Sequence, residues 1–300
     1  MKQLVILSGK GGTGKTSVAA AFAHLAANGN AAILVDADVD AANLELLLAP
    51  EVLESHEFGG GQVAVINEVS CEGCGICKDV CRFDAVHEAD GVFRADPIAC
   101  DGCAACVYQC PEHSIHMQPQ MAGHWYRSTT RFGPMFHAAL RPAQENSGKL
   151  VTMVKQQARL LAMDESYDLV LVDGPPGIGC PVISAVAGAD LALIVAEPTA
   201  SGTHDMRRAL QTTVHFGVPA MVCINKSDLY HLGSDEIEAY CRTEGIPVAG
   251  KIPFDPSVTE AIVQGQPVTV FRPRAPASEA LRDLWERVNS ELMEGDLDHA

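Results

Sequence analysis

Positive charge is scarce in this sequence, and long apolar runs are missing. Lys and Arg number 21 against 38 Asp and Glu, which gives a formal net charge of -17 at pH 7. Clustered basic residues are what neutralise nucleic-acid phosphates and what an anionic membrane surface attracts, so we expect neither as a partner. No run approaches the ~18 apolar residues that a membrane-spanning helix needs. We therefore expect no stable membrane association.

An export signal is also missing. Residues 1–7 are typical of a buried strand and lack the charged, apolar and cleavable regions of a secretory leader, so we expect a cytoplasmic protein. With 300 residues, 47% of them hydrophobic, the chain is long enough for one large α/β domain and a small inserted one, without disulfides. In a reducing compartment, closely spaced cysteines predict metal ligands.

Eight of the eleven cysteines form two copies of the spacing Cys-x-x-Cys-x-x-Cys-x-x-x-Cys, shifted by 29 residues. In bacterial ferredoxins each such run gives three thiolates to one cubane cluster and its last cysteine to the other cluster. Zinc sites use two separated pairs instead, which leaves zinc or free thiols as weaker alternatives. The spacing predicts two [4Fe-4S] clusters in an inserted α+β ferredoxin-like domain over 52–117. The predicted ligands are Cys71, Cys74, Cys77 and Cys110 for the first cluster, and Cys81, Cys100, Cys103 and Cys106 for the second.

The two cysteine runs differ at one position. Pro111 follows the last cysteine of the second run, whereas Arg82 follows that of the first. Because proline shapes the turn and removes a hydrogen-bond donor, we expect the two clusters to be inequivalent. Of the three other cysteines, Cys223 and Cys241 are expected in the hydrophobic core.

A glycine-rich motif, Ser8-Gly9-Lys10-Gly11-Gly12-Thr13-Gly14-Lys15-Thr16, stands between an expected strand and an expected helix. Glycines let the backbone N–H groups point inward, and the helix adds its positive end, so the motif predicts a phosphate-binding loop. Lys15 is expected to reach the β- and γ-phosphates, and the Thr16 hydroxyl to bind Mg²⁺. The predicted nucleotide contacts in this loop are Gly9, Lys10, Gly11, Gly12, Thr13, Gly14, Lys15, Thr16 and Ser17.

Short apolar runs alternate with helix-length segments outside the cysteine-rich part. The expected buried strands are residues 4–7, 31–35, 169–172, 191–195 and 220–224. This alternation predicts an α/β fold, a parallel sheet wrapped by helices that forms a discontinuous P-loop ATPase domain over 1–51 and 118–300. Within it, we expect 118–148 to be a connector. An amphipathic helix over 278–292 is expected to pack against the body of this domain.

These motifs resemble those of the MinD/ParA/Mrp and nitrogenase iron protein ATPases. Lys10-Gly11-Gly12-Thr13-Gly14-Lys15-Thr16 is similar to their deviant Walker A motif, Val35-Asp36-Ala37-Asp38 to their first switch, and 171–177 to their second switch. Together with the cysteine runs, the order is similar to the superfamily members that contain an inserted ferredoxin domain. The resemblance implies a homodimer, or a heterodimer with a related ATPase, in which Lys10 reaches the partner's nucleotide.

The resemblance also implies roles for acidic residues. Asp38 orients the attacking water and acts with Lys10 and Lys15 in catalysis, while Asp36 and Asp173 complete the Mg²⁺ site begun by Thr16. Asp40 is a third carboxylate near the first switch, so it stays an alternative to Asp38. Cys180 lies seven residues after Asp173, the offset at which the nitrogenase iron protein has a cluster ligand. It is a possible dimer-interface thiol, although a structural role is favoured.

The base is assigned from two competing signals. The segment Asn225-Lys226-Ser227-Asp228 is typical of guanine-binding GTPases, whereas the family resemblance implies ATP, with Asn225, Pro253 and Asp255 around the adenine. We favour ATP, since the deviant Walker A motif is the more informative feature.

Three functions follow from the combination of nucleotide and cluster motifs. The favoured one is a nucleotide-switched dimer that couples ATP hydrolysis to electron transfer through two clusters. The alternatives are a carrier or scaffold for metal-cluster assembly and a MinD-like positioning ATPase with structural clusters. The expected partner is a redox protein or an apo-metalloprotein, which the sequence does not identify.

Overall fold

The computed structural model describes residues 1–27, 32–141 and 146–294. The chain divides into two compact units. The first consists of Met1–Ser55, Trp125–Ala139 and Ser147–Ala300, and the second of His56–His124 and Leu140–Asn146. The second unit begins and ends later than the inserted segment expected at 52–117, and it takes in a further short segment. Its identity as a ferredoxin-like domain stays a prediction.

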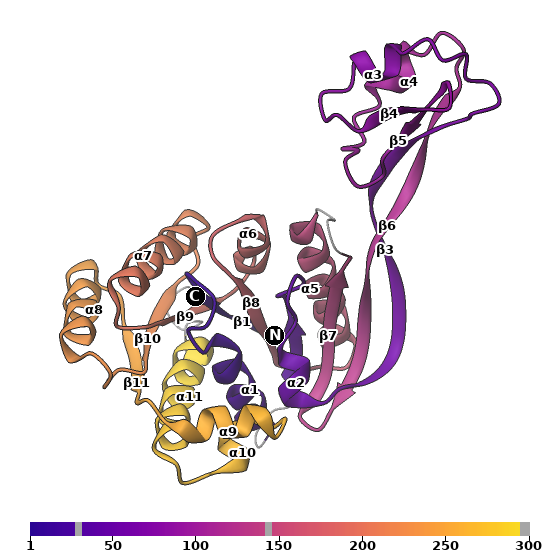
Figure 1. Cartoon of the computed structure of the whole chain (residues 1–300). Coiled ribbons are helices and arrows are strands. Elements are labelled where there is room, and N and C mark those ends of the chain that lie inside the picture. The colour runs from indigo at the N-terminus through magenta and orange to yellow at the C-terminus, as the bar shows by residue number, and fades with distance from the viewer. Residues whose placement is uncertain (28–31, 142–145, 295–300) are drawn as a thin grey trace. The chain divides into compact units, whose positions relative to one another are not determined.

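The first unit is built on a mostly parallel sheet, as the sequence predicts (Figure 1). Strand β1 is central and pairs in parallel with β8 and β9, and β2 pairs in parallel with β8 and β7. The sheet has nine strands in the order β11-β10-β9-β1-β8-β2-β7-β6-β3. Their bounds are β1 Lys2–Ser8, β2 Ala32–Asp36, β3 Glu51–Ile66, β6 Ile115–Thr130, β7 Gly133–Leu140, β8 Leu169–Pro176, β9 Leu191–Ala196, β10 Ala220–Asn225 and β11 Val248–Ile252.

Helices cover both faces of this sheet (Figure 1). One layer consists of α1 (Lys15–Ala26), α2 (Leu44–Leu48), α9 (Pro256–Val263), α10 (Val268–Phe271) and α11 (Pro276–Glu294). The other consists of α5 (Ser147–Asp164), α6 (Cys180–Val186), α7 (Ala200–His215) and α8 (His231–Glu244). The expected amphipathic helix is confirmed as α11, which packs Trp285 on Phe22 of α1 with ring centroids 4.9 Å apart. Within the described ranges, no helix is long and apolar enough to cross a bilayer.

The expected connector at 118–148 is a wrong prediction. Most of it lies in β6 and β7, which form a hairpin joined by residues 131–132. Strand β7 adds to the edge of β2, with Met135 opposite Leu34. The burial of these strands is irregular, because stacked rings such as Trp125 and Phe136 replace a continuous apolar run. Residue 31, expected to begin the second strand, lies outside the described residues.

The second unit repeats its backbone once. Its helices are α3 (Ile76–Asp79) and α4 (Ala105–Gln109), and the strands β4 (Val86–Ala89) and β5 (Val92–Ala95) form an antiparallel hairpin. Positive φ angles recur at positions 29 residues apart, namely 70° at Gly73 and 74° at Gly102, and 50° at both Asp84 and His113. The unit's small core consists of Ala64, Ile66, Cys77, Val86, Phe93 and Ile115. The internal repeat predicted from the cysteine spacing is therefore a repeat of backbone conformation.

Candidate functional site

The phosphate-loop motif lies between β1 and α1, at the carboxyl end of the central strand. Gly14 precedes the helix with a φ of 91°, which glycine adopts without strain, and a Cβ there would lie 2.3 Å from the Asn225 side-chain nitrogen. No side chain caps α1, so the first N–H groups of the helix remain available for an anion. Thr16 and Ser17 lie in the first turn. The backbone therefore has the features that a bound phosphate group requires.

Lys15 forms a buried ion pair at the base of this loop. Its Nζ lies 2.7 Å from Oδ1 of Asp173, and the two side chains are 6% and 1% exposed. The second oxygen of Asp173, Oδ2, is buried and has no hydrogen-bond partner. A buried polar atom without a partner is costly, which points to a ligand in this place. Thr13 Oγ1, also in the loop, is buried and lacks a partner as well.

Asp36 is brought beside Asp173, because the two are register partners on the adjacent parallel strands β2 and β8. Its carboxylate accepts hydrogen bonds from the N–H groups of Asp38 at 3.1 Å and Leu44 at 3.0 Å. Burial, and then the charge of Asp173, raise the pKa of Asp36 well above its ordinary value. Two buried carboxylates side by side, with one lysine between them and water, favour a cation. Asp36, Asp173 and Thr16 are thus suitably placed residues for Mg²⁺.

Asp38 lies just beyond β2 and is partly buried. Burial raises the pKa of its carboxyl group, and the nearby Lys15 charge opposes that rise. Asp40 is exposed two residues further on. The structure places both acids after the same strand, so the choice of Asp38 as the water-orienting residue stays a prediction.

Lys10 is held by a residue that the sequence analysis missed. Its Nζ lies 3.2 Å from Oε2 of Glu197, whose other oxygen is 2.5 Å from Nζ of Lys226. Burial alone would raise the pKa of Glu197, but hydrogen bonds from Lys226 and Lys10 bring it below its usual value. Glu197 follows β9 at the carboxyl edge of the sheet, and that position was the available signal. The three side chains form an ionic bridge, Lys10–Glu197–Lys226, along the loop.

The residues proposed to contact the base already have partners. Asn225 donates from Nδ2 to the Thr13 carbonyl at 2.7 Å, which joins it to the phosphate loop. Asp255 caps α9, accepting from the Ser257 N–H at 2.9 Å, and Pro253 lies two residues before it. Asp228 accepts from the Phe254 N–H at 2.6 Å. Neither the adenine nor the guanine assignment is tested by these contacts, and both stay predictions.

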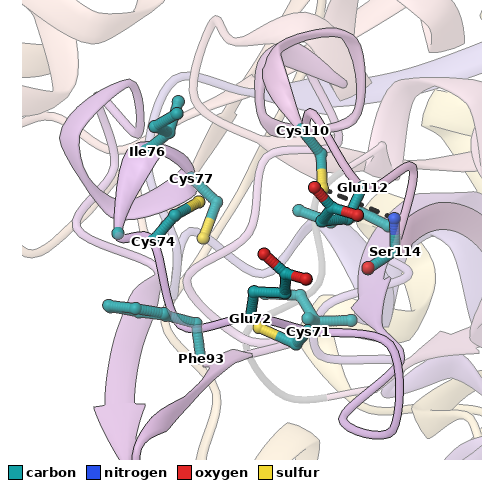
Figure 2. A pocket seen from close by; sticks show the side chains of 12 residues that line it. Cys71, Glu72, Cys74, Ile76, Cys77, Phe93, Cys110, Glu112 and Ser114 are labelled. Atoms are coloured by element: carbon teal, nitrogen blue, oxygen red, sulfur yellow. Dashed lines mark hydrogen bonds between the residues drawn. The ribbon is translucent and has the colours of Figure 1, made fainter.

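The eight cysteines of the second unit gather around two separate pockets, which we call the first and the second cysteine group. Each pocket takes three cysteines from one run and the last cysteine of the other run, the crossed pattern that the spacing predicts. The first group is Cys71, Cys74, Cys77 and Cys110, shown in Figure 2. The second is Cys81, Cys100, Cys103 and Cys106. All eight are free thiols.

Backbone donors point at sulfur in both cysteine groups. The N–H of Ser114 lies 3.4 Å from Cys110 Sγ, and that of Ala85 lies 3.4 Å from Cys81 Sγ. Such bonds favour thiolates, the form that binds iron. Burial raises the pKa of Cys77, so this thiol stays protonated until a positive centre binds. Within the described residues no group of three or more His, Cys, Asp or Glu converges on a single ion. The residues fit a cluster, whose ligands attach to different iron atoms, better than one metal ion.

The remaining cysteines are divided between surface and core. Cys180 is exposed at the start of α6. Cys223 and Cys241 are fully buried, and burial raises the pKa of these thiols to about 12 and about 11. Their expected structural role is confirmed.

Comparison with known proteins identifies relatives of the whole chain. The family profile described as the CobQ/CobB/MinD/ParA nucleotide binding domain matches residues 4–268. An uncharacterized protein of Methanocaldococcus jannaschii is 31% identical over 95% of this chain and 96% of its own length. A protein of Pyrococcus abyssi named iron-sulfur cluster carrier protein is 26% identical over 97% of this chain and 87% of its own. The solved structure of the septum site-determining protein MinD of Pyrococcus horikoshii with Mg-ADP has a TM-score of 0.59 at 20% identity, covering 96% of each chain.

Proposed function

We propose, on the premise that this chain belongs to the CobQ/CobB/MinD/ParA family of nucleotide-binding proteins, that it is a Mg²⁺-dependent ATPase carrying two [4Fe-4S] clusters. The observation that supports the cluster half is the grouping of eight cysteines around two pockets in the crossed pattern. The observation that supports the nucleotide half is the uncapped start of α1 beside the buried pair of Lys15 and Asp173.

ATP binding requires Lys15 to exchange partners. In the structure its ammonium group neutralises Asp173, whereas phosphates of a bound nucleotide would draw it into the loop. Asp173 then joins Asp36 and the Thr16 hydroxyl around Mg²⁺, which supplies neutralisation of phosphate charge. Asp38 orients the attacking water, and Lys10 adds positive charge at the phosphates of its own chain or of a dimer partner.

The proposed role of ATP is to switch electron transfer through the clusters in a dimer. The segment that follows β2 carries Asp36 and Asp38, and the chain enters the second unit at residue 56 soon afterwards. A rearrangement of this segment around the γ-phosphate is therefore close in sequence to the cluster-bearing unit. Electron transfer and ATP hydrolysis would be coupled through this connection.

Anaerobic reconstitution of the full chain tests the proposal. We expect about eight iron atoms per chain and a reducible [4Fe-4S] signal by electron paramagnetic resonance (EPR), together with Mg²⁺-dependent ATP hydrolysis. Cys110→Ser and Cys81→Ser should each reduce the iron content to about four, in different pockets. Cys180→Ser is the matched control and should leave eight. An iron content that stays at eight in both ligand variants would refute the crossed grouping, and about ten in the unaltered chain would indicate a shared third cluster.

A second candidate function is cluster delivery, favoured by the printed name of the Pyrococcus abyssi relative. A carrier releases its cluster to an acceptor, whereas an electron-transfer protein keeps it. Incubation of the loaded chain with an apo-ferredoxin, with and without ATP, separates the two. Transfer of iron and sulfide to the acceptor would favour the carrier, and retention on this chain favours electron transfer.

A further inference from the structure

The two cysteine groups have matching linings except at one charged position. Positions 29 residues apart correspond, so Glu72 of the first pocket matches Asp101 of the second, and both are acidic. Ser114 and Ala85 also correspond, and each donates its N–H to a cysteine Sγ at 3.4 Å. The exception is Glu112, whose counterpart is Phe83.

The carboxylate of Glu112 is directed to the first cysteine group. Figure 2 shows it beside the Cys110 sulfur, with the Glu72 carboxylate turned to the same space. Within the described residues, neither carboxylate forms an ion pair that would cancel its charge. Phe83, in contrast, brings an uncharged ring to the second pocket and is 44% exposed.

Charges that do not line the pockets largely offset one another. Lys78 and Asp79 follow a ligand of the first group, and Arg82 and Asp84 follow a ligand of the second, all four exposed. Each pair is a base with an acid. Arg82, which the sequence singled out, therefore has its own compensating acid, and the uncompensated difference is Glu112.

Resting on the proposed presence of two clusters, we propose that Glu112 makes the cluster of the first group the harder one to reduce, so that electrons pass from it to the cluster of the second group. Reduction adds one negative charge to a cluster, and a fixed carboxylate nearby opposes it. The second group has an additional bond, from the Ala64 N–H to Cys100 Sγ at 3.5 Å, which favours its reduced form. In the transfer the first cluster loses one electron and the second gains it. A low-potential one-electron donor protein supplies the first cluster.

An anaerobic potentiometric titration of the full chain, followed by EPR, tests the order. The unaltered chain should give two separate midpoint potentials. Glu112→Gln keeps the side-chain shape and removes the charge, so it should raise the lower potential and leave the higher one in place. We expect about a fivefold change in the electron-exchange equilibrium between the clusters, or about 40 mV at ~59 mV per tenfold. Phe83→Glu should lower the higher potential and so also narrow the gap.

Glu88→Gln is the matched control, because Glu88 is exposed in the same unit and lines neither pocket. It should leave the gap unchanged. Coincident potentials in the unaltered chain, or a Glu112→Gln variant that shifts the higher potential or neither, would overturn the proposal. If Glu112→Gln does not assemble clusters, Phe83→Glu decides the matter alone. A chain that binds no iron at all would instead refute the proposed function.

Discussion

At the scale of single residues, the buried pair of Lys15 and Asp173 shows how the nucleotide site is held ready without its ligand. Each charge would be costly alone at 6% and 1% exposure, and each neutralises the other. The sequence assigned both residues to the nucleotide site, but to different ligands. Their mutual contact depends on the register of β1 and β8 and on the first turn of α1, which no local motif encodes.

Asp38 is expected to be required for ATP hydrolysis and dispensable for ATP binding. Asp38→Asn removes the group that orients water, so we expect the turnover rate to fall by roughly 100-fold or more, with little change in nucleotide affinity. Asp40→Asn is the matched control, since Asp40 lies on the same segment and is exposed. Steady-state phosphate release and equilibrium nucleotide binding measure the two effects. A larger loss in Asp40→Asn would move the role to that residue.

Glu197 is expected to restrain Lys10 before dimerisation. In Glu197→Gln the charge that holds Lys10 at 3.2 Å is removed, so Lys10 is free to reach a partner's nucleotide. We expect the ATP-dependent dimer to form at up to about tenfold lower protein concentration, equivalent to ~1.4 kcal/mol. Analytical ultracentrifugation with a non-hydrolysable analogue measures this. In a Lys10→Ala background the same substitution should have no effect, and an equal gain there would contradict the role of Glu197.

At the scale of elements, strands with continuous apolar runs are predicted well and strands with exposed faces are not. The expected strand at 169–172 is β8, and that at 191–195 is β9, each longer at its carboxyl end by a few polar or small residues. Strand β3 was missed because its first seven residues are exposed, which leaves no hydrophobic pattern. Partners supplied by β6, not local sequence, keep it extended.

Lys155 joins two helices and provides a pH-dependent test of the fold. Its Nζ donates to the carbonyl oxygens of Ser184, Ala185 and Ala187 at 2.8, 2.6 and 2.9 Å, at the end of α6. Lys155→Met leaves these carbonyls without a donor, so we expect the free energy of unfolding to fall by about 1–3 kcal/mol at pH 7. Lys149→Met, at an exposed position of the same helix, should cost far less.

The pH dependence has a definite sign. Burial lowers the pKa of Lys155 from 10.5 to about 8. Between these values the unfolded chain binds more protons than the folded one, so this group's contribution to stability rises with pH, by at most about 1.4 kcal/mol per unit. Denaturant unfolding from pH 7 to pH 10.5 should therefore show the unaltered chain gaining stability relative to Lys155→Met. A difference that stays constant or narrows would contradict the low pKa.

At the scale of the whole molecule, the order of motifs predicted more than any single motif. A phosphate loop, acids after two strands and a pair of cysteine runs identified a P-loop ATPase of the MinD/ParA type, and the family match supports that assignment. The crossed grouping of the cysteines followed from spacing alone. The inequality between the clusters did not, because the sequence draws attention to Arg82, whereas the side chain that lines the pocket is Glu112.

The most direct measurement for the proposed function is an anaerobic redox titration of the reconstituted chain without nucleotide, with ADP, and with a non-hydrolysable ATP analogue. If ATP controls the clusters, at least one midpoint potential should differ between the analogue and ADP, and the difference should disappear in Lys15→Ala, which removes the residue expected to contact the phosphates. Titration curves that coincide in all three nucleotide states would contradict coupling between ATP and the clusters.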